Sequence, residues 1–424
     1  MNIKNLLIPN NWKIREGLLC LISVTLLFKL NYGNIAIIIA IIYNIFFFER
    51  KNLNKFKTIA FIFPAVLFVI TVLSSILSKD YIKGLKHTDL ELLALLILII
   101  IINHKIEKQI ITKIFICFYY ASVLSTIILL FNFVLRLSSG KTVEDIIFHD
   151  FTVLYDQHPV YFGMFLSLSL FSKIFFQKVN KIKFLYFFLN CILVLGIILC
   201  SSKVLLVFNS IFYLIYFYFK IKSKEKKFFY LILTLSLVFG IFKISFINKR
   251  FKEGLVFNSK MFYFEPTNDF SKKTTFSYED KINISDLELR YIFGKIGLFH
   301  LVKDNKLWFG YGQGDVQNYL DYYFMSYNLA PNWYEKFNIH NQYLHVLITY
   351  GLFTLLFFLF YLFYCLYIAI KHKDILYLFF LGMTLIVFIF EVVLVRNKGI
   401  VFFYFFNTLF LFKYINFENR NIRY

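Results

Sequence analysis

Long apolar runs, separated by short polar stretches, make up most of this chain. We interpret twelve of these runs as membrane-spanning helices, each of which needs roughly 20 residues to cross the hydrocarbon core. The runs cover residues 17–32, 34–48, 58–78, 87–103, 111–136, 159–176, 183–201, 204–219, 228–247, 342–369, 375–394 and 399–415. Solid runs such as Leu92–Ile102 lack the alternation of apolar and polar positions that a membrane barrel requires, so the pattern favours helices.

The longest polar stretch, residues 248–340, interrupts this pattern. It divides the chain into N-terminal membrane helices (1–247), a large loop (248–340) and C-terminal membrane helices (341–424). About nine spans would precede the loop and about three would follow it. The chain is therefore predicted to be an all-α polytopic membrane protein with about twelve transmembrane helices and one large, partly helical loop.

Inside the loop, helical signals begin at residue 285. Ser285-Asp-Leu-Glu288 is typical of a capping box, and apolar residues then recur at helical spacing as far as Phe299. Lys303 and the two residues after it are expected to end this helix. Residues 250–280 are expected to be irregular, and the glycine-rich segment 308–314 is expected to form a flexible link.

Composition excludes a soluble globular protein, because 59% of the residues are hydrophobic and the mean hydropathy is +0.67. The net charge of +21 is concentrated in alternate connections between the apolar runs, which hold 24 of the 46 basic residues but 6 of the 25 acidic ones. This is the positive-inside pattern, so both termini are expected in the cytoplasm and the large loop outside. It argues against a nucleic-acid partner. The basic connections are 1–16, 49–57, 104–113, 173–183, 220–227, 371–374 and 413–424.

Neither cysteines nor acidic pairs point to a metal or another cofactor. The five cysteines all lie in or beside apolar runs, outside the loop, and are interpreted as packing residues. Two acidic pairs, Asp89-Leu-Glu91 and Asp286-Leu-Glu288, each follow a serine or threonine in a capping-box pattern. Helix capping explains these carboxylates more simply than a metal site does.

One histidine stands at a membrane boundary. His340 ends the loop and precedes an apolar run, and a neutral imidazole can take a proton from an attacking hydroxyl group. The alternative is that His340 caps the helix that follows. His300 and His345 are expected to lie on helices where packing explains them.

Three cations are expected on the outer side, where the positive-inside bias gives no reason for them. They are Arg290, Lys203 and Arg396. Cations near the membrane plane are costly unless they are paired or bind an anion, and a phosphate-bearing lipid would explain several of them together. The alternatives are an ordinary ion pair, for example Glu391 with Arg396, or contacts with lipid headgroups.

Two further features concern the space around these groups. Gly294 and Gly297 fall on the same helix face as Arg290, which is expected to leave room for a bulky anion beside the guanidinium. His158 precedes Pro159 at the outer end of an apolar run and could line a site there. The proline itself is ordinary at a first helical position.

The order of several short motifs carries a family resemblance. In chain order they are His158-Pro159-x-Tyr161, Ser201-Ser202-Lys203, Leu289-Arg290 to Gly294, Phe309-Gly310-x-Gly312-x-Gly314, His340-Asn341-x-Tyr343-Leu344, Tyr350-Gly351-Leu352, and Glu391 to Arg396 with Gly399. Together they resemble the O-antigen ligase family, which also includes O-antigen polymerases. The resemblance covers about residues 155–412, and the earlier apolar runs match only as spans.

This resemblance implies a metal-independent glycosyltransferase at the periplasmic face of the bacterial inner membrane. The donor would be a glycan on undecaprenyl pyrophosphate, and the acceptor a sugar hydroxyl, on lipid A–core for a ligase. The site residues expected on this basis are His340 and Arg290 for catalysis, and Lys203, Arg396, Asn341, His158 and Glu391 for substrate binding. One departure is Lys203, because the family usually has arginine there and lysine lacks the bidentate fork.

Other functions remain open at this stage. A polymerase would share the spans, the loop and the motifs, but would use a second lipid-linked glycan as its acceptor. A transporter of lipid-linked sugars would carry charges in mid-span and two related halves, whereas the charges here gather at run ends and in the loop. A non-enzymatic glycolipid-binding factor is a third alternative.

Overall fold

A computed structural model describes residues 3–176, 183–269, 275–330 and 333–421, and these ranges contain helices but no strand. The part before the loop forms α1 (Ile3–Thr25), α2 (Leu30–Phe46), η1 (Arg50–Lys57), α3 (Ile59–Ile76), α4 (Tyr81–Lys86), α5 (Thr88–Ile102), α6 (Lys108–Ser138), α7 (His149–Thr152), η2 (Val153–Tyr155), α8 (Pro159–Phe176), α9 (Lys183–Leu199), α10 (Lys203–Lys220) and α11 (Lys224–Lys243). The remainder forms α12 (Ser245–Leu255), α13 (Ser259–Phe262), α14 (Tyr278–Asn283), α15 (Asp286–Lys303), α16 (Val316–Ser326), α17 (Gln342–Tyr350), α18 (Leu352–Lys371), α19 (Ile375–Phe390) and α20 (Asn397–Asn421).

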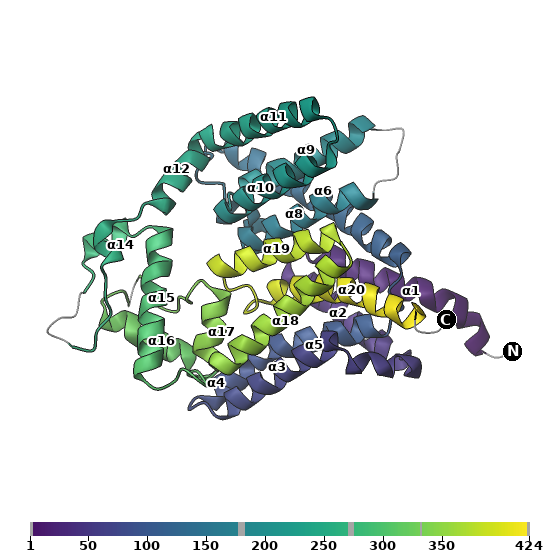
Figure 1. Cartoon of the computed structure of the whole chain (residues 1–424), viewed down its shortest axis with the longest axis horizontal. Helices are drawn as coiled ribbons and strands as arrows, with labels where there is room; N and C mark the ends of the chain where they lie inside the picture. The colour runs from purple at the N-terminus through teal and green to yellow at the C-terminus, as the bar shows by residue number, and fades with distance from the viewer. Residues whose placement is uncertain (1–2, 177–182, 270–274, 331–332, 422–424) are drawn as a thin grey trace.

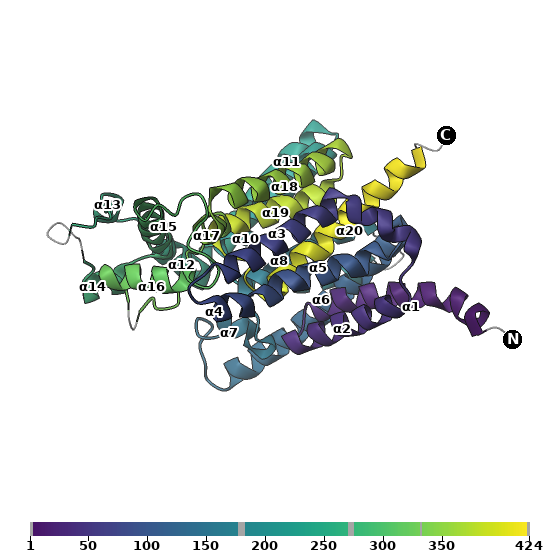
Figure 2. The ribbon, with the colours of Figure 1, turned by 90° about the horizontal axis from the view of Figure 1, so that it is seen from below.

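The long apolar helices form a bundle, and the loop helices α13–α16 gather at one of its ends (Figure 1). The two chain termini lie at the opposite end, which is clearest when the bundle is seen from below (Figure 2). One hydrophobic core runs through the bundle, and a smaller one joins α15, α16 and α17. In the smaller core the rings of Phe293 and Phe324 stack with their centroids 4.1 Å apart. The loop is therefore a folded unit seated on the bundle.

Among the described residues, five helices are long and apolar enough to cross a membrane: α3, α6, α8, α10 and α18. The bent pairs α2 with η1 and α11 with α12 would raise that number to seven if each pair is one span, and α9 and α19 are apolar but shorter. The chain is thus an all-helical protein with the character of a membrane protein. Each of the twelve predicted runs contains a helix, although Gly351 divides the run 342–369 into α17 and α18.

Some local predictions within the loop and before it were wrong. Arg250 lies on α12, so the irregular stretch begins only after Leu255. The segment 308–314 is not a flexible link, because Tyr311 N–H donates to Ile348 O (2.8 Å) and Gly312 N–H donates to Thr349 O (3.0 Å). These bonds fix the segment along the end of α17.

The two predicted capping boxes had different outcomes. The Ser285 box is confirmed, since Ser285 Oγ accepts from Glu288 N–H and the Glu288 carboxylate accepts from Ser285 N–H. At α5 the N-cap residue is His87, with no side-chain cap. The Thr88 box was therefore wrong: Thr88 lies inside the first turn, and its hydroxyl donates to Leu85 O instead.

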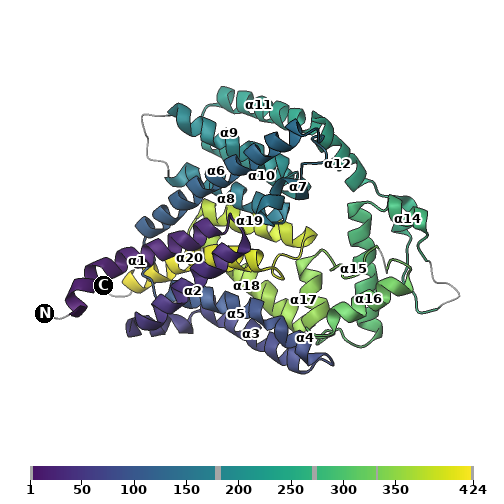
Figure 3. The same ribbon diagram turned by 180° about the vertical axis from the view of Figure 1, so that it is seen from behind.

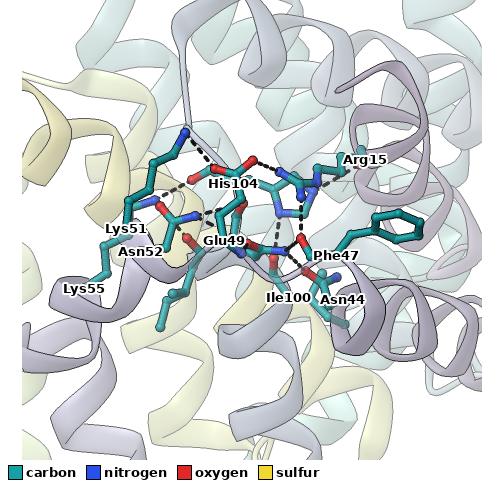
Figure 4. A network of polar contacts seen from close by, with 11 residues as sticks. Arg15, Asn44, Phe47, Glu49, Lys51, Asn52, Lys55, Ile100 and His104 are labelled. Atoms are coloured by element: carbon teal, nitrogen blue, oxygen red, sulfur yellow. Dashed lines mark hydrogen bonds and ion pairs between the residues drawn. The ribbon is translucent and has the colours of Figure 1, made fainter. Parts of the chain in front are cut away.

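At the end of the bundle that carries the termini, a buried arginine is held by a polar network (Figure 4). Arg15 pairs with Glu49 at 2.5 Å and also donates to Phe47 O. The ring of His104 lies between Arg15 O (3.3 Å) and Ile100 O (2.6 Å). A buried charge is tolerated when it is paired and hydrogen-bonded in this way. The network joins α1, η1 and α5.

Candidate functional site

The candidate site surrounds a break between two helices. α19 ends at Phe390, Glu391 is extended (φ −152°, ψ 148°), and α20 begins at Asn397. Such a break leaves backbone groups without hydrogen-bond partners in a helix, and side chains from other elements supply those partners. The contacts are Arg290 Nε to Phe390 O (3.1 Å), Asn341 Nδ2 to Ile389 O (3.0 Å), Tyr161 Oη to Val392 O (3.1 Å) and Leu394 N to Gln342 Oε1 (2.8 Å).

His340 faces this break from the start of α17. Its backbone is left-handed (φ 48°), and its N–H donates to Asn338 Oδ1 at 2.8 Å. Asn341, not His340, caps α17, because its side chain accepts from Leu344 N–H at 2.9 Å. The imidazole is therefore free of the capping role that was its alternative explanation.

A carboxylate faces the buried side of this imidazole. His340 Nδ1 is buried without a hydrogen-bond partner, and Glu391 Oε2 lies 3.7 Å from it. Burial raises the pKa of Glu391, but the proximity of His340 and the charges of His158 and Arg290 outweigh burial and lower that pKa overall. An ionised Glu391 can orient the ring with its proton on Nδ1, so that Nε2 is left as the basic nitrogen.

The ion pair between Glu391 and Arg396, which was the alternative explanation for Arg396, does not form, and the carboxylate faces His340 instead. Arg396 is exposed and lies on the other side of the break. His158 does belong to this neighbourhood, because the charges of Glu391, Arg396 and His340 all reach it. Burial is the main cause that lowers the pKa of His158 to about 4, so its imidazole is neutral at physiological pH.

A cavity of about 420 Å³ adjoins Glu391, and we call it the cationic cavity. Three cations lie at one end, namely Lys203 on α10, Arg250 on α12 and Arg290 on α15. Most of the remaining wall is apolar and is formed mainly by α10 and α19, with α12 and α15 (Figure 3 shows these helices from behind), and Ser201, Ser202, Asp286 and Glu391 add polar groups to it. Its apolar lining comprises Val204, Val207, Phe208, Ile211, Phe212, Ile215, Phe251, Leu255, Leu287, Ile386, Val387 and Phe390, with Phe148 and Val160.

Asp286 balances the charge of these cations. Its Oδ2 lies 2.6 Å from Lys203 Nζ. Burial raises the pKa of Asp286, but Lys203 and the charges of Arg290 and Arg250 lower it overall. Asp286 therefore stays ionised among three cations, and an anion that enters this end of the cavity would compete with it.

Arg250 was missed by the sequence analysis. Its guanidinium lies 3.7 Å from the ring centroid of Phe148, and its buried Nε has no hydrogen-bond partner. A cation just after an apolar run on the outer side is the same signal that singled out Lys203. That signal was hidden because Lys249 and Lys252 flank Arg250 and suggest an ordinary solvated stretch.

Free space was predicted beside Arg290 on the helix face of Gly294 and Gly297, but that face is filled. A Cβ atom on Gly297 would meet Ile339 Cδ1 and Ile348 Cδ1 at 2.7 Å each, and one on Gly294 would meet Leu344 Cδ1 at 3.4 Å. These glycines let α15 pack closely on α17. The room beside Arg290 lies instead on the side of α10 and α19.

A second cavity, of about 310 Å³, lies beside α17, and we call it the polar cavity. Asn338 and Gln342 line it, so it begins beside the His340 segment. Its polar lining also includes Lys83, His87, Glu91, Gln313, Gln317, Lys336, His345, Tyr350 and Arg396. Apart from Arg396, these residues were not predicted as site residues. The sequence signal that could have predicted this cavity is the pair Gln342 and His345, which lie three residues apart on one face of a helix.

The structure thus brings the predicted residues together in three ways. Lys203 and Arg290 share the cationic cavity, His340 with Glu391 and His158 lies at the helix break, and Arg396 lines the polar cavity. Asn341 uses both ends of its side-chain amide for the α17 cap and Ile389 O. His300 packs as predicted, with its ring 3.7 Å from that of Tyr323. Among the described residues, no group of three or more His, Cys, Asp or Glu side chains could hold a metal ion.

Comparison with known proteins adds no relative to this description. No family model matches the chain, and no curated protein matches it either.

Proposed function

We propose that this chain is a membrane-bound glycosyltransferase of the O-antigen ligase type. It would move a glycan from undecaprenyl pyrophosphate to a sugar hydroxyl, on lipid A–core or another glycan acceptor. The observation that carries the proposal is the cationic cavity, which combines a cluster of cations with a long apolar wall and ends beside the His340–Glu391 pair. A polyprenyl pyrophosphate has the same two parts, an anionic head and an apolar chain.

The dimensions of the cavity suit such a donor. Its lining follows α10 from Lys203 to Ile215, and the helix rises by about 18 Å between these two residues. Lys203, Arg250 and Arg290 would bind the pyrophosphate and stabilise the charge that develops on it as it leaves. The polyprenyl chain would lie along the apolar face of α10 and α19, in contact with membrane lipids.

His340 would activate the acceptor. In one displacement, the acceptor hydroxyl gives its proton to His340 Nε2, and its oxygen forms a bond to the anomeric carbon of the donor. The bond between that carbon and the phosphate oxygen breaks, and its electron pair stays with undecaprenyl pyrophosphate. The ionised Glu391 stabilises the imidazolium that forms, and it positions the ring in the correct tautomer.

For this function the chain would cross the membrane about twelve times, with both termini in the cytoplasm and the loop in the periplasm. The positive-inside distribution supports it, as does the position of the termini opposite the loop helices (Figure 2). The protein would then lie in the bacterial inner membrane, with its site at the periplasmic face.

The test is a reconstitution of the purified protein with a lipid-linked glycan and lipid A–core, without metal or nucleotide. One glycan joined to each acceptor would establish a ligase. A ladder of lengthening lipid-linked glycan would instead establish a polymerase. The variant His340→Ala should reduce transfer by roughly 10²-fold to 10⁴-fold while donor binding survives. Full transfer by this variant would rule out the base, and no transfer by the wild type on substrates that a known ligase uses would favour a non-enzymatic role.

A further inference from the structure

An open groove of about 640 Å³ lies between α4 and α16, apart from the two cavities described above. α4 and α16 are neighbours at the loop end of the bundle, as the front and back views agree (Figure 1, Figure 3). We call it the tyrosine groove. The residues that define it are Asp80, Tyr81, Asn318, Tyr319, Tyr322 and Tyr323.

The wall that α16 contributes is rigid. The ring of Tyr319 stacks on that of Tyr311 with centroids 4.3 Å apart. Tyr311 Oη donates to Asp304 Oδ2 at 2.7 Å, and Tyr323 Oη donates to the same oxygen. These contacts hold in place the helix from which Tyr322 also projects.

A carboxylate at the start of α16 holds the opposite wall in place. Asp315 accepts hydrogen bonds from the backbone N–H groups of Lys79 (2.7 Å) and Asp80 (2.9 Å). This carboxylate, which is buried, fixes the α3–α4 turn relative to the loop. The width of the groove is therefore set by the fold.

Two rings project into solvent from these walls. Tyr81 is 54% exposed and Tyr322 is 63% exposed. Asp80 and Asn318, whose side chains carry oxygen atoms, line the same groove. Rings that offer an apolar face, next to a few polar atoms that fix orientation, suit a ligand with flat C–H faces and hydroxyl groups at its edges. Sugar rings have this character.

The groove adjoins the polar cavity. Lys83 lines the polar cavity, Asn318 lines the groove, and Lys83 Nζ donates to Asn318 Oδ1 at 2.7 Å. This exposed contact joins a residue that lines the polar cavity to one that lines the groove.

We propose that the tyrosine groove binds a segment of the glycan chain outside the reaction site. This inference rests on the proposed transferase function, which it deepens by giving the length of the glycan a place in recognition. A glycan of several repeats would extend from the polar cavity past Lys83 and Asn318 and lie on Tyr81 and Tyr322. A glycan of one repeat would not reach them.

Exposed tyrosines near a membrane surface also occur as contacts with lipid headgroups. The Asp80 and Asn318 oxygens and the link to the polar cavity favour a glycan here. The two occupants differ in what the aromatic rings contribute, because only a glycan site predicts that their loss weakens the binding of a lipid-free saccharide.

The experiment measures binding of the cells' own glycan, released from its lipid by mild acid, labelled at the reducing end and titrated with the full-length protein in detergent. Tyr322→Ala and Tyr81→Ala should each raise Kd about threefold to tenfold, because each removes one stacking face. Tyr322→Phe keeps that face and should bind as the wild type does. Tyr263→Ala is the matched control, since Tyr263 is also an exposed loop tyrosine (77%) and lies outside the groove.

The outcomes separate this inference from the transferase function. Unchanged Kd in both alanine variants, or no binding by the wild type, would overturn the groove and leave these rings as lipid contacts. Such a result would not affect transfer of a single-repeat donor, which Tyr322→Ala should carry out at the wild-type rate. Conversely, tyrosine-dependent binding in a protein that transfers nothing would sustain the groove and refute the transferase.

Discussion

At the scale of single residues, the state of His340 depends on its neighbours. Asn341 caps α17, so the imidazole is not used to satisfy backbone groups. Glu391 Oε2 lies 3.7 Å from Nδ1 of His340. A small movement of the ring when an acceptor binds would bring these two atoms within hydrogen-bond distance. A capping residue and a carboxylate fifty residues later together make the ring available as a base.

Arg250 is expected to contribute to donor binding as strongly as Arg290. Charge-assisted hydrogen bonds are each worth about 1.5–3 kcal/mol, so Arg250→Ala should raise the KM for a lipid-linked donor by roughly tenfold or more. The matched control is Lys249→Ala, because Lys249 pairs with Glu144 on the surface and does not line the cationic cavity. Steady-state kinetics with purified protein measure the effect. Equal KM values for the two variants would show that Arg250 does not contribute to donor binding.

His158 should make the stability of the protein depend on pH. Its pKa is about 4 when folded, below the ordinary value of 6.5. The unfolded chain therefore binds a proton more readily between these values, and stability falls as the pH drops from 6.5 toward 4. The loss reaches about 3 kcal/mol near pH 4.

The variant His158→Gln cannot gain this proton, so its melting temperature should fall less between pH 6.5 and 4.5 than that of the wild type. At pH 8 the imidazole is neutral in both states, and the pH-dependent difference between the two proteins should vanish. Parallel melting curves across the whole range would show that His158 is not buried in its neutral form.

At the scale of elements, two breaks between helices are informative, and the break after α19 lies at the candidate site. α17 and α18 are divided at Gly351, and α19 and α20 are separated by residues 391–396. The break after α19 leaves backbone groups without helical partners, and Arg290, Asn341 and Gln342 satisfy these groups.

Gly351 is expected to be essential for the first of these breaks. Its φ is +85°, and a Cβ atom there would lie 2.1 Å from Trp308 O. Gly351→Ala should therefore lower the stability by about 2 kcal/mol or more, which thermal unfolding in detergent can measure. In contrast, a Cβ atom on Gly33 of α2 would meet nothing within 4 Å, so Gly33→Ala should be neutral or stabilising. Equal destabilisation by both changes would contradict this account.

At the scale of the whole molecule, the distribution of charge and the position of the chain termini indicate the same orientation of the bundle. The alternate connections that hold 24 of the 46 basic residues include both termini, and the termini lie at the end of the bundle opposite the loop helices (Figure 2). A bundle that spans a membrane would therefore place its basic connections on one side and both cavities toward the other.

This orientation predicts which positions a membrane-impermeant thiol reagent can reach in intact cells. In a chain whose five cysteines are replaced by alanine, Tyr278→Cys on α14 should be labelled from outside. Lys224→Cys, at the start of α11, should be labelled only after the membrane is permeabilised. Labelling of both positions in intact cells would contradict the proposed topology.

Local patterns predicted the long apolar helices, the position of the loop along the chain and the Ser285 capping box, because apolar run length and capping are local properties. They also singled out His340, Arg290 and Lys203, since cations and histidines at the ends of apolar runs are conspicuous. The packing of distant helices, in contrast, brings Arg250 to Lys203 and Arg290 and places Arg396 in a different cavity. The same packing fills the space at Gly297 with Ile339 and Ile348. The shape of a cavity depends on how distant helices pack, and no local pattern encodes that packing.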